Sequence, residues 1–177
     1  MIMIDMLIFI AEFSWAADFV ALCLVFALAI KHRTPSSTLL TLTATVLFCG
    51  LMNSYTPTLY LLDAPLLFSY KLFAWYIGFA LLNGLAILTI WYLHRCFKLR
   101  YGMIARMALL QYFVLAQLQL LRYGERLLWQ TDYLKPIYQA GIASINIGTA
   151  LVALGFAVLA LHHELNTNHH KGVKWTL

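Results

Sequence analysis

Charged residues are scarce in this sequence. Only 11% of the 177 residues are Asp, Glu, Lys or Arg, whereas 63% are hydrophobic, and the mean hydropathy is +0.79. A soluble domain carries about 25% charged residues, so seven acids and twelve bases are too few to cover a water-exposed surface. This scarcity argues against a soluble globular protein and indicates an integral membrane protein, whose first partner is the lipid bilayer.

Cysteine is also rare, and the familiar catalytic patterns are missing. The three cysteines, Cys23, Cys49 and Cys96, lie on different segments and form no CxxC pair, which speaks against a thiol redox motif or a zinc knuckle. The sequence contains no HExxH, GxSxG, P-loop or GxGxxG pattern. We therefore expect a protein that is not an enzyme and that carries no cofactor.

Long apolar runs, by contrast, are abundant. A helix that crosses the roughly 30 Å hydrocarbon layer needs about 20 mostly apolar residues. Five segments meet this requirement, so the predicted fold is an all-α bundle of five transmembrane helices. It forms a single domain over residues 1–165, followed by a short polar tail at residues 166–177. The predicted spans are residues 6–30, 38–62, 67–93, 102–121 and 136–162.

The distribution of Lys and Arg predicts how this bundle is oriented. These residues are retained in the cytoplasm when they lie close to the ends of membrane helices. With the amino terminus outside and the carboxyl terminus in the cytoplasm, eight of the twelve bases fall on the cytoplasmic side. They are Lys31, Arg33, Arg95, Lys98, Arg100, Arg106, Lys171 and Lys174. The net charge of +5 then reflects orientation and contact with anionic lipid rather than binding to nucleic acid. The compact loops favour a bacterial inner membrane.

One polar side chain lies near the centre of each predicted helix. Polar groups at this depth are costly unless they face protein or a wet cavity. The five residues are Asp18, Asn53, Asn83, Gln111 and Asn146. Two interpretations remain open, a hydrogen-bonded network that holds the bundle together and a polar path or ligand site with Asp18 as its ionisable member.

A second polar cluster is predicted in the outer half of the bundle. Its members are Glu12, Tyr55, Lys71, Gln119 and Arg122. Glu12 and Lys71 should lie at similar depth, where opposite charges are natural partners. Gln119 and Arg122 share one stripe of their helix with Gln111, so this face should not meet lipid. The cluster predicts a polar vestibule, and the alternative is an ordinary interfacial region with snorkelling bases.

The fifth predicted helix carries a line of small residues. Gly141, Ser144, Gly148 and Gly155 are spaced so that all four fall near one face. Small residues let another backbone approach closely, and this heptad-like spacing favours left-handed packing. The simpler expectation is that the line packs against the first helix of the same chain, and the alternative is the fifth helix of another copy.

All six histidines lie at the predicted cytoplasmic boundary or in the tail. His94, His162 and His163 are weak candidates for metal or haem ligands, because neutral His is the commonest metal ligand. The adjacent pair His162 and His163 points about 100° apart on a helix, and no His-x3-His pair lies within a predicted helix. Structural or solvent-facing histidines are therefore favoured.

Two functions of different classes account for these features. The preferred one is a non-enzymatic subunit or anchor of a membrane protein assembly, because it explains the short loops, the small-residue line and the lack of a catalytic motif. The alternative is a small channel or transporter built around Asp18, working as an oligomer because five helices enclose little space. A carrier of metal or haem at the cytoplasmic face rests on the histidines alone.

Overall fold

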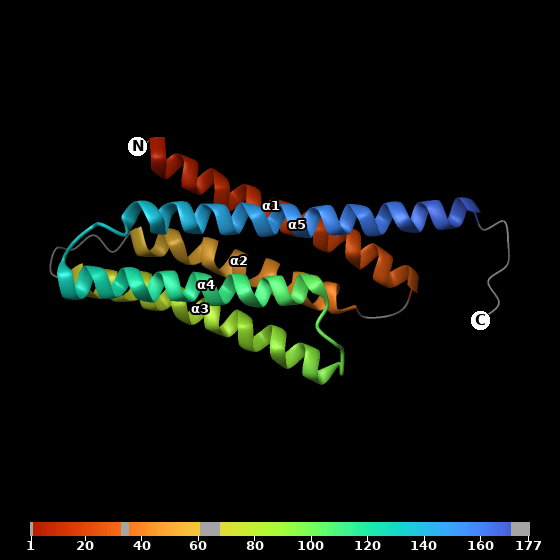
Figure 1. Ribbon diagram of the computed structural model, residues 1–177, viewed down its shortest axis with the longest axis horizontal. Coiled ribbons are helices and arrows are strands. Elements are labelled where there is room, and N and C mark those ends of the chain that lie inside the picture. Colours follow the sequence, from red (N-terminus) through yellow and green to blue (C-terminus); the bar gives the residue numbers. More distant parts are fainter. Residues whose placement is uncertain (1, 33–35, 61–67, 171–177) are drawn as a thin grey trace.

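The structure is a computed structural model that describes residues 2–32, 36–60 and 68–170, and this part of the chain is all-helical (Figure 1). Its α-helices are α1 (Ile2–His32), α2 (Ser37–Tyr60), α3 (Phe68–Cys96), α4 (Met103–Gly124) and α5 (Lys135–His170). A π-helical turn, η2 (Glu125–Trp129), continues α4 directly. The all-α prediction is confirmed, and the described residues contain no strand.

Within the described residues, four helical stretches are long and apolar enough to cross a membrane. They are Ser37–Thr56, Tyr70–Cys96, Met103–Trp129 and Lys135–Leu159. Helix α1 contains a shorter apolar stretch, Trp15–Ile30. The outer surface of the bundle is covered by large apolar side chains such as Phe26, Leu88 and Leu110, as expected where lipid replaces water as the solvent.

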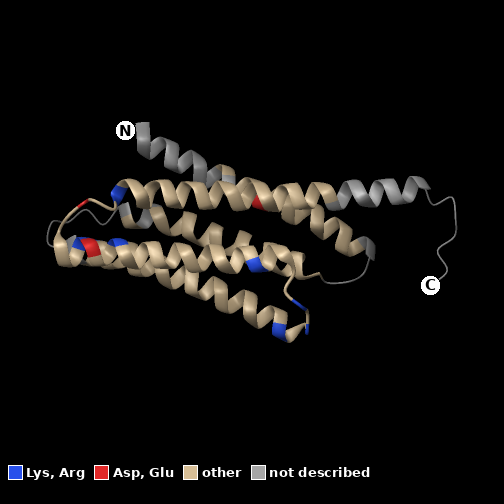
Figure 2. Ribbon diagram, viewed as in Figure 1, with Lys and Arg blue, Asp and Glu red and all other residues tan. Residues whose placement is uncertain are grey.

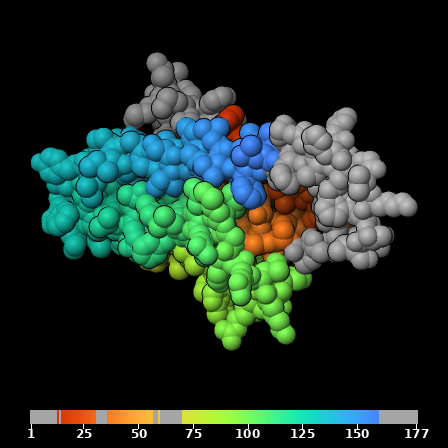
Figure 3. All heavy atoms as spheres, turned by 45° about the vertical axis from the view of Figure 1, so that its right-hand side comes forward, coloured from red at the N-terminus to blue at the C-terminus, as the bar shows by residue number. Residues whose placement is uncertain are grey.

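Helices that follow one another in the chain pack side by side, and α5 closes the bundle by crossing α1 obliquely (Figure 1). The most extensive contacts join α1 to α5 and α3 to α4, while α2 contacts α1, α3 and α4. Helix α4 also packs along α5, and the space-filling view in Figure 3 shows these two helices lying against each other. Groups on α1, α2, α4 and α5 can therefore meet near the bundle axis.

Small side chains bring the helices close together. One buried cluster consists of Ala21, Val25, Leu42, Ile104, Ala153 and Ala157. A second consists of Ala44, Phe48, Ala86, Ile90, Ala108 and Tyr112. Each of the five helices contributes at least one alanine to these clusters. Membrane helices associate through close packing because lipid tails are as apolar as their side chains, and alanine permits that close packing.

Two helix ends differ from the predicted spans for the same physical reason. The fourth span was predicted to end at residue 121, but helical structure continues to Trp129. The fifth was predicted to end at 162, but α5 continues to His170 and takes in the start of the predicted tail. The rest of the tail, residues 171–177, lies outside the described residues. Charged and polar residues end an apolar run, but they do not end a helix.

The end of α3 is formed without a glycine. The Leu99 amide donates to the His94 carbonyl at 2.9 Å and the Lys98 amide donates to the Arg95 carbonyl at 3.2 Å. Lys98 takes the left-handed conformation with φ 53°, so the pattern is a Schellman motif in which lysine occupies the usual glycine position. This turn directs the chain from α3 toward α4.

Candidate functional site

Figure 2 shows most of the described charged residues toward the two ends of the bundle, with one acidic residue midway along it and one basic residue of α4 at about the same level. The end formed by the α3–α4 connection carries four exposed bases, Arg95, Lys98, Arg100 and Arg106. The opposite end carries Lys71, Arg122, Arg126 and Lys135 together with the acids Glu125 and Asp132. The remaining acid among the described side chains is Asp18 of α1.

Asp18 lies at a small cavity where four helices converge. Its side chain is buried, with 6% of the residue exposed. The cavity has a volume of about 20 Å³, which is room for one water-sized molecule. Its polar walls are Asp18 of α1, Thr45 of α2, Gln111 of α4 and Thr149 of α5, and the other walls are apolar. This cavity is the candidate functional site.

The polar side chains that line the cavity make no described hydrogen bond with one another. Within the described part of the chain, Asp18 makes no ion pair and no hydrogen bond. The Thr149 hydroxyl donates its proton to the Ile145 carbonyl at 2.7 Å, so its oxygen lone pairs remain available. The arrangement can accept a small polar or positively charged guest.

Three of the five predicted central residues lie elsewhere. Asn83 is buried, and its side-chain nitrogen donates to the Phe79 carbonyl of its own helix at 2.7 Å. Asn53 and Asn146 are half-buried, and neither of them lines the cavity. Among the residues that the structure describes, no hydrogen bond joins any two of the five predicted residues. The structure brings Asp18 and Gln111 together at one cavity and leaves the three asparagines apart.

The two threonines of the cavity were not predicted from the sequence. Thr45 and Thr149 lie near the middle of their apolar stretches, Ser37–Thr56 and Lys135–Leu159. A threonine inside a helix can satisfy its hydroxyl on a carbonyl of its own helix, which makes it unremarkable as a single residue. Both threonines would have been found if hydroxyl side chains, as well as amides and acids, had been compared by their position along each predicted membrane span.

Arg122 is buried in a network that closes the connection between α4 and α5. Its guanidinium donates to the carboxylates of both Glu125 and Asp132. The Arg122 hydrogen bond holds the pKa of Asp132 below its ordinary value, so this pairing persists at neutral pH. Glu125 also accepts a hydrogen bond from the Leu134 amide at 2.9 Å. This network is a structural clamp at the end of α4.

Gln119 extends the same polar face of α4 toward α5. The Tyr138 hydroxyl of α5 donates to the Gln119 side-chain oxygen at 2.8 Å. Gln111, Gln119 and Arg122 are all buried on α4, as their shared stripe predicts. Glu125 was not predicted as a partner of Arg122, although its position three residues later on a helix was the signal for that pair.

The other predicted members of the outer cluster are placed differently. The Tyr55 hydroxyl donates to the Ala74 carbonyl of α3 at 2.9 Å, so this tyrosine joins α2 to α3. A Cβ atom at Gly78 would lie 2.7 Å from the Tyr55 hydroxyl oxygen, so the contact requires glycine there. Lys71 is half-buried, whereas the side chain of Glu12 lies outside the described residues, and their pairing stays a prediction.

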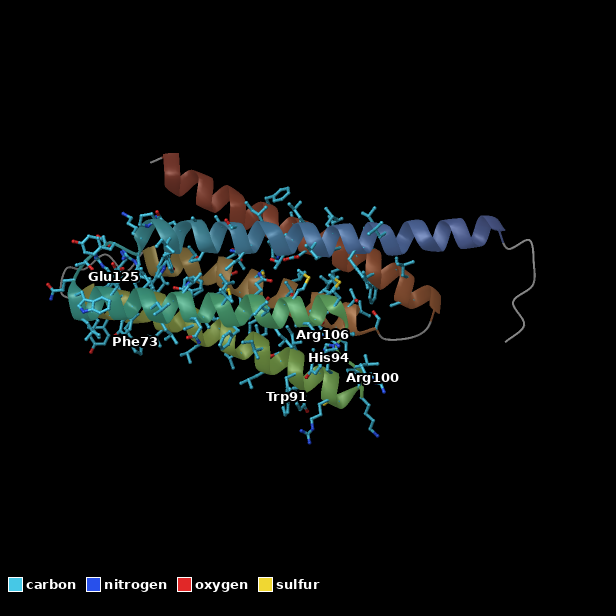
Figure 4. The ribbon with its side chains drawn as sticks, in the orientation of Figure 1. Phe73, Trp91, His94, Arg100, Arg106 and Glu125 are labelled. Carbon is cyan, nitrogen blue, oxygen red and sulfur yellow. The ribbon has the colours of Figure 1, made fainter. Side chains whose placement is uncertain are left out.

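His94 of α3 links its helix to α2 and to the start of α4, at the opposite end of the bundle from Glu125 (Figure 4). Its Nδ1 lies 2.8 Å from the Ile90 carbonyl oxygen, which can only accept, so Nδ1 carries the proton. Its Nε2 then accepts from the Ser37 hydroxyl of α2 at 2.8 Å. The Gly102 amide, which precedes α4, donates to that same hydroxyl oxygen at 2.9 Å.

Both ring nitrogens of His94 are therefore engaged, which leaves no lone pair for a metal ion. Its ring also stacks on Tyr101, with 4.7 Å between the ring centroids. The side chains of His162 and His163 lie outside the described residues. Among the side chains that are described, no three His, Cys, Asp or Glu residues gather into a candidate metal site.

The small-residue line of α5 faces mostly away from the bundle. Ser144 is exposed, and a Cβ atom at Gly148 or Gly155 would meet no described atom within 4 Å. Gly141 alone approaches the chain's own bundle, where its Cβ would lie 3.1 Å from a methyl group of Leu118. The expected packing of the line against α1 is therefore not what the described residues show.

Helix α5 meets α1 through its alanines instead. Ala153 and Ala157 are buried in the cluster that contains Ala21 of α1. Ala157 follows Gly148 by nine residues, which places the two on opposite sides of the helix at about 100° per residue. The alanine face fills the interface inside the chain, and the line of Ser144, Gly148 and Gly155 is left on the outer surface.

No protein-family model, curated protein or solved structure matches this chain. Two features of the molecule itself bear on its function, the cavity at Asp18 and the outward line of small residues on α5.

Proposed function

We propose that the chain is a non-enzymatic integral membrane protein that serves as a subunit of a membrane protein assembly. The outward line of Ser144, Gly148 and Gly155 carries this proposal. A glycine inside a helix lowers helix stability by about 1 kcal/mol relative to alanine, and contact with lipid does not offset this loss. Contact with a neighbouring transmembrane helix can offset it, because two helices approach closely over small residues.

The polar clusters at the two ends of the bundle support the same proposal. His94 connects α2, α3 and the start of α4, and Arg122 connects the end of α4 to the chain leading into α5. Each of these groups is engaged by partners inside the chain, as in a structural element. Their arrangement favours a rigid building block over a reaction centre.

The mass of the purified particle tests this proposal. Protein extracted from its native membrane in mild detergent should elute as a particle whose protein mass, by light scattering, exceeds the 20.2 kDa of one chain. Additional copies or a co-purifying membrane protein would each account for the excess. A particle that holds one chain alone, across several mild detergents, would contradict the subunit role.

We further propose that five helices cross a bacterial inner membrane, with the amino terminus outside and the carboxyl terminus in the cytoplasm. The exposed bases of the α3–α4 end, without a described acid beside them, support this orientation. At the same end, the Arg95 guanidinium lies 5.3 Å from the centre of the Trp91 ring in a cation–π contact, and tryptophan is enriched at membrane interfaces. The other four predicted cytoplasmic bases lie outside the described side chains.

Reporter fusions test the orientation. A green fluorescent reporter joined after residue 170 should be bright, whereas an alkaline phosphatase reporter at the same point should be inactive, because the former folds in the cytoplasm and the latter in the periplasm. Fusions in the connection between α4 and α5 should give the opposite result. An active phosphatase after residue 170 would reverse the orientation.

The Asp18 cavity favours a second candidate function, a small oligomeric channel or transporter. Conduction through a site centred on this carboxylate should be abolished by Asp18→Asn, which removes the charge and keeps the size of the side chain. Flux of monovalent ions into liposomes measures the effect, with thermal stability of the same samples as the control for folding. No flux from stable wild-type protein would exclude conduction and leave the subunit role standing.

A further inference from the structure

The Asp18 carboxylate has no ion-pair partner among the described residues. Cys49 of α2 and Tyr112 of α4 lie within electrostatic range of Asp18, but thiol and phenol groups are ordinarily uncharged at neutral pH. Arg106, near the start of α4, is the described base at a similar level of the bundle (Figure 4), but its side chain is exposed and makes no ion pair with Asp18. A carboxylate buried without a partner is strongly disfavoured, so its surroundings call for a positive charge.

The walls of the cavity offer that charge a set of oxygen ligands. A carboxylate, two hydroxyls and one amide come together from four different helices. Oxygen atoms of this kind are the ligands that hard cations prefer in proteins. Because the Thr149 hydroxyl gives its proton to the Ile145 carbonyl, its oxygen presents lone pairs, as a cation ligand must.

We propose that this cavity binds one dehydrated monovalent metal cation. Asp18 is its charged ligand, and Thr45, Gln111 and Thr149 are its neutral oxygen ligands. One carboxylate balances one positive charge, whereas Ca²⁺ would remain half-compensated and takes six to eight oxygen ligands. A volume of about 20 Å³ admits an alkali ion without its hydration shell and excludes an organic cation such as choline.

This inference goes beyond the proposed function, because binding requires neither a protein partner nor passage of the ion across the membrane. The cation would neutralise the centre of the bundle and tie α1 to α2, α4 and α5 through one shared guest. It should therefore stabilise the folded chain even where no flux is measured.

Thermal unfolding of the purified protein tests the proposal. Midpoints are recorded in LiCl, NaCl or KCl, each exchanged for choline chloride at constant ionic strength. At least one alkali cation should raise the midpoint saturably, by about 3–6 °C at ten times its dissociation constant. Equal midpoints in all four salts would overturn the proposal, and so would stability that depends on pH and on no alkali cation, because a proton would then be the occupant.

Three variants locate the effect. Asp18→Asn should abolish the cation-dependent rise, and Thr149→Val, which removes one ligand oxygen at nearly constant size, should raise the half-saturating concentration several-fold. Asp132→Asn removes an acid outside the cavity and should leave the rise unchanged, whatever its effect on the baseline midpoint. If Asp18→Asn does not fold, the half-saturating cation concentration of Thr149→Val tests the proposal on its own. A full rise in Asp18→Asn, or an unaltered half-saturation in Thr149→Val, would contradict the assignment.

Discussion

Replacing His94 with alanine should lower the free energy of unfolding by about 3 kcal/mol, because the change removes a buried ring together with its hydrogen bonds. The residue is only 2% exposed, and α2 loses one of its hydrogen bonds to α3 when Ser37 loses this partner. Packing against Tyr101 is lost as well. Equilibrium unfolding in mixed detergent micelles, compared with the wild type, measures the difference.

The neighbouring residue provides the control for this variant. Arg95 is exposed and contacts the Trp91 ring alone among the described interactions, so Arg95→Ala should cost less than about 1 kcal/mol. A chelator should leave the stability of the wild type unchanged, because both nitrogens of His94 are engaged within the protein. Equal losses for the two variants, or a loss caused by the chelator, would contradict a structural role for His94.

Replacing Gly148 with leucine should weaken the assembly at least tenfold while leaving the bundle folded. The added side chain would meet no described atom of its own chain near the Cβ position, so the fold has no steric reason to change. In the assembly, the same side chain would hold a neighbouring helix away from the backbone of α5. Light scattering should show the particle falling toward the 20.2 kDa protein mass of one chain.

Gly84 of α3 offers a matched substitution. A Cβ atom there also meets no described atom within 4 Å, so Gly84→Leu adds the same volume to a different helix. This variant should keep the mass of the wild-type particle. If Gly148→Leu also keeps it, the small-residue line is not a contact surface, and if both variants dissociate, the effect is not specific to α5.

The helices themselves were predictable because length and apolar character nearly suffice to specify a membrane span. The predicted second span, residues 38–62, corresponds closely to α2 at Ser37–Tyr60. The end of α4 was not predictable in this way, because Arg122 and Glu125 neutralise each other and allow helical structure to continue into η2. Pairing between charges is a property of three-dimensional contact, which a count of apolar residues does not contain.

The sequence predicted the level of the candidate site along the bundle, but it did not predict which polar side chains face one another. Asp18 and Gln111 were placed at the same level of the bundle, and they share a cavity. Asn83 was placed at that level too, yet it bonds to its own helix. Where a helix is apolar on every side, its sequence pattern does not fix which face turns inward. For the same reason the Gly148 face and the Ala157 face of α5 were both plausible interfaces, and only the fold separates them.

Cysteine cross-linking at position 148 in native membranes tests the subunit role most directly. The three free cysteines, Cys23, Cys49 and Cys96, are replaced by serine, and Gly148→Cys is oxidised in the membrane beside a Gly84→Cys control. The account predicts a cross-linked product at position 148, either a pair of chains or one chain joined to a partner, and none at position 84. No product at position 148, or the same product at both positions, would contradict it.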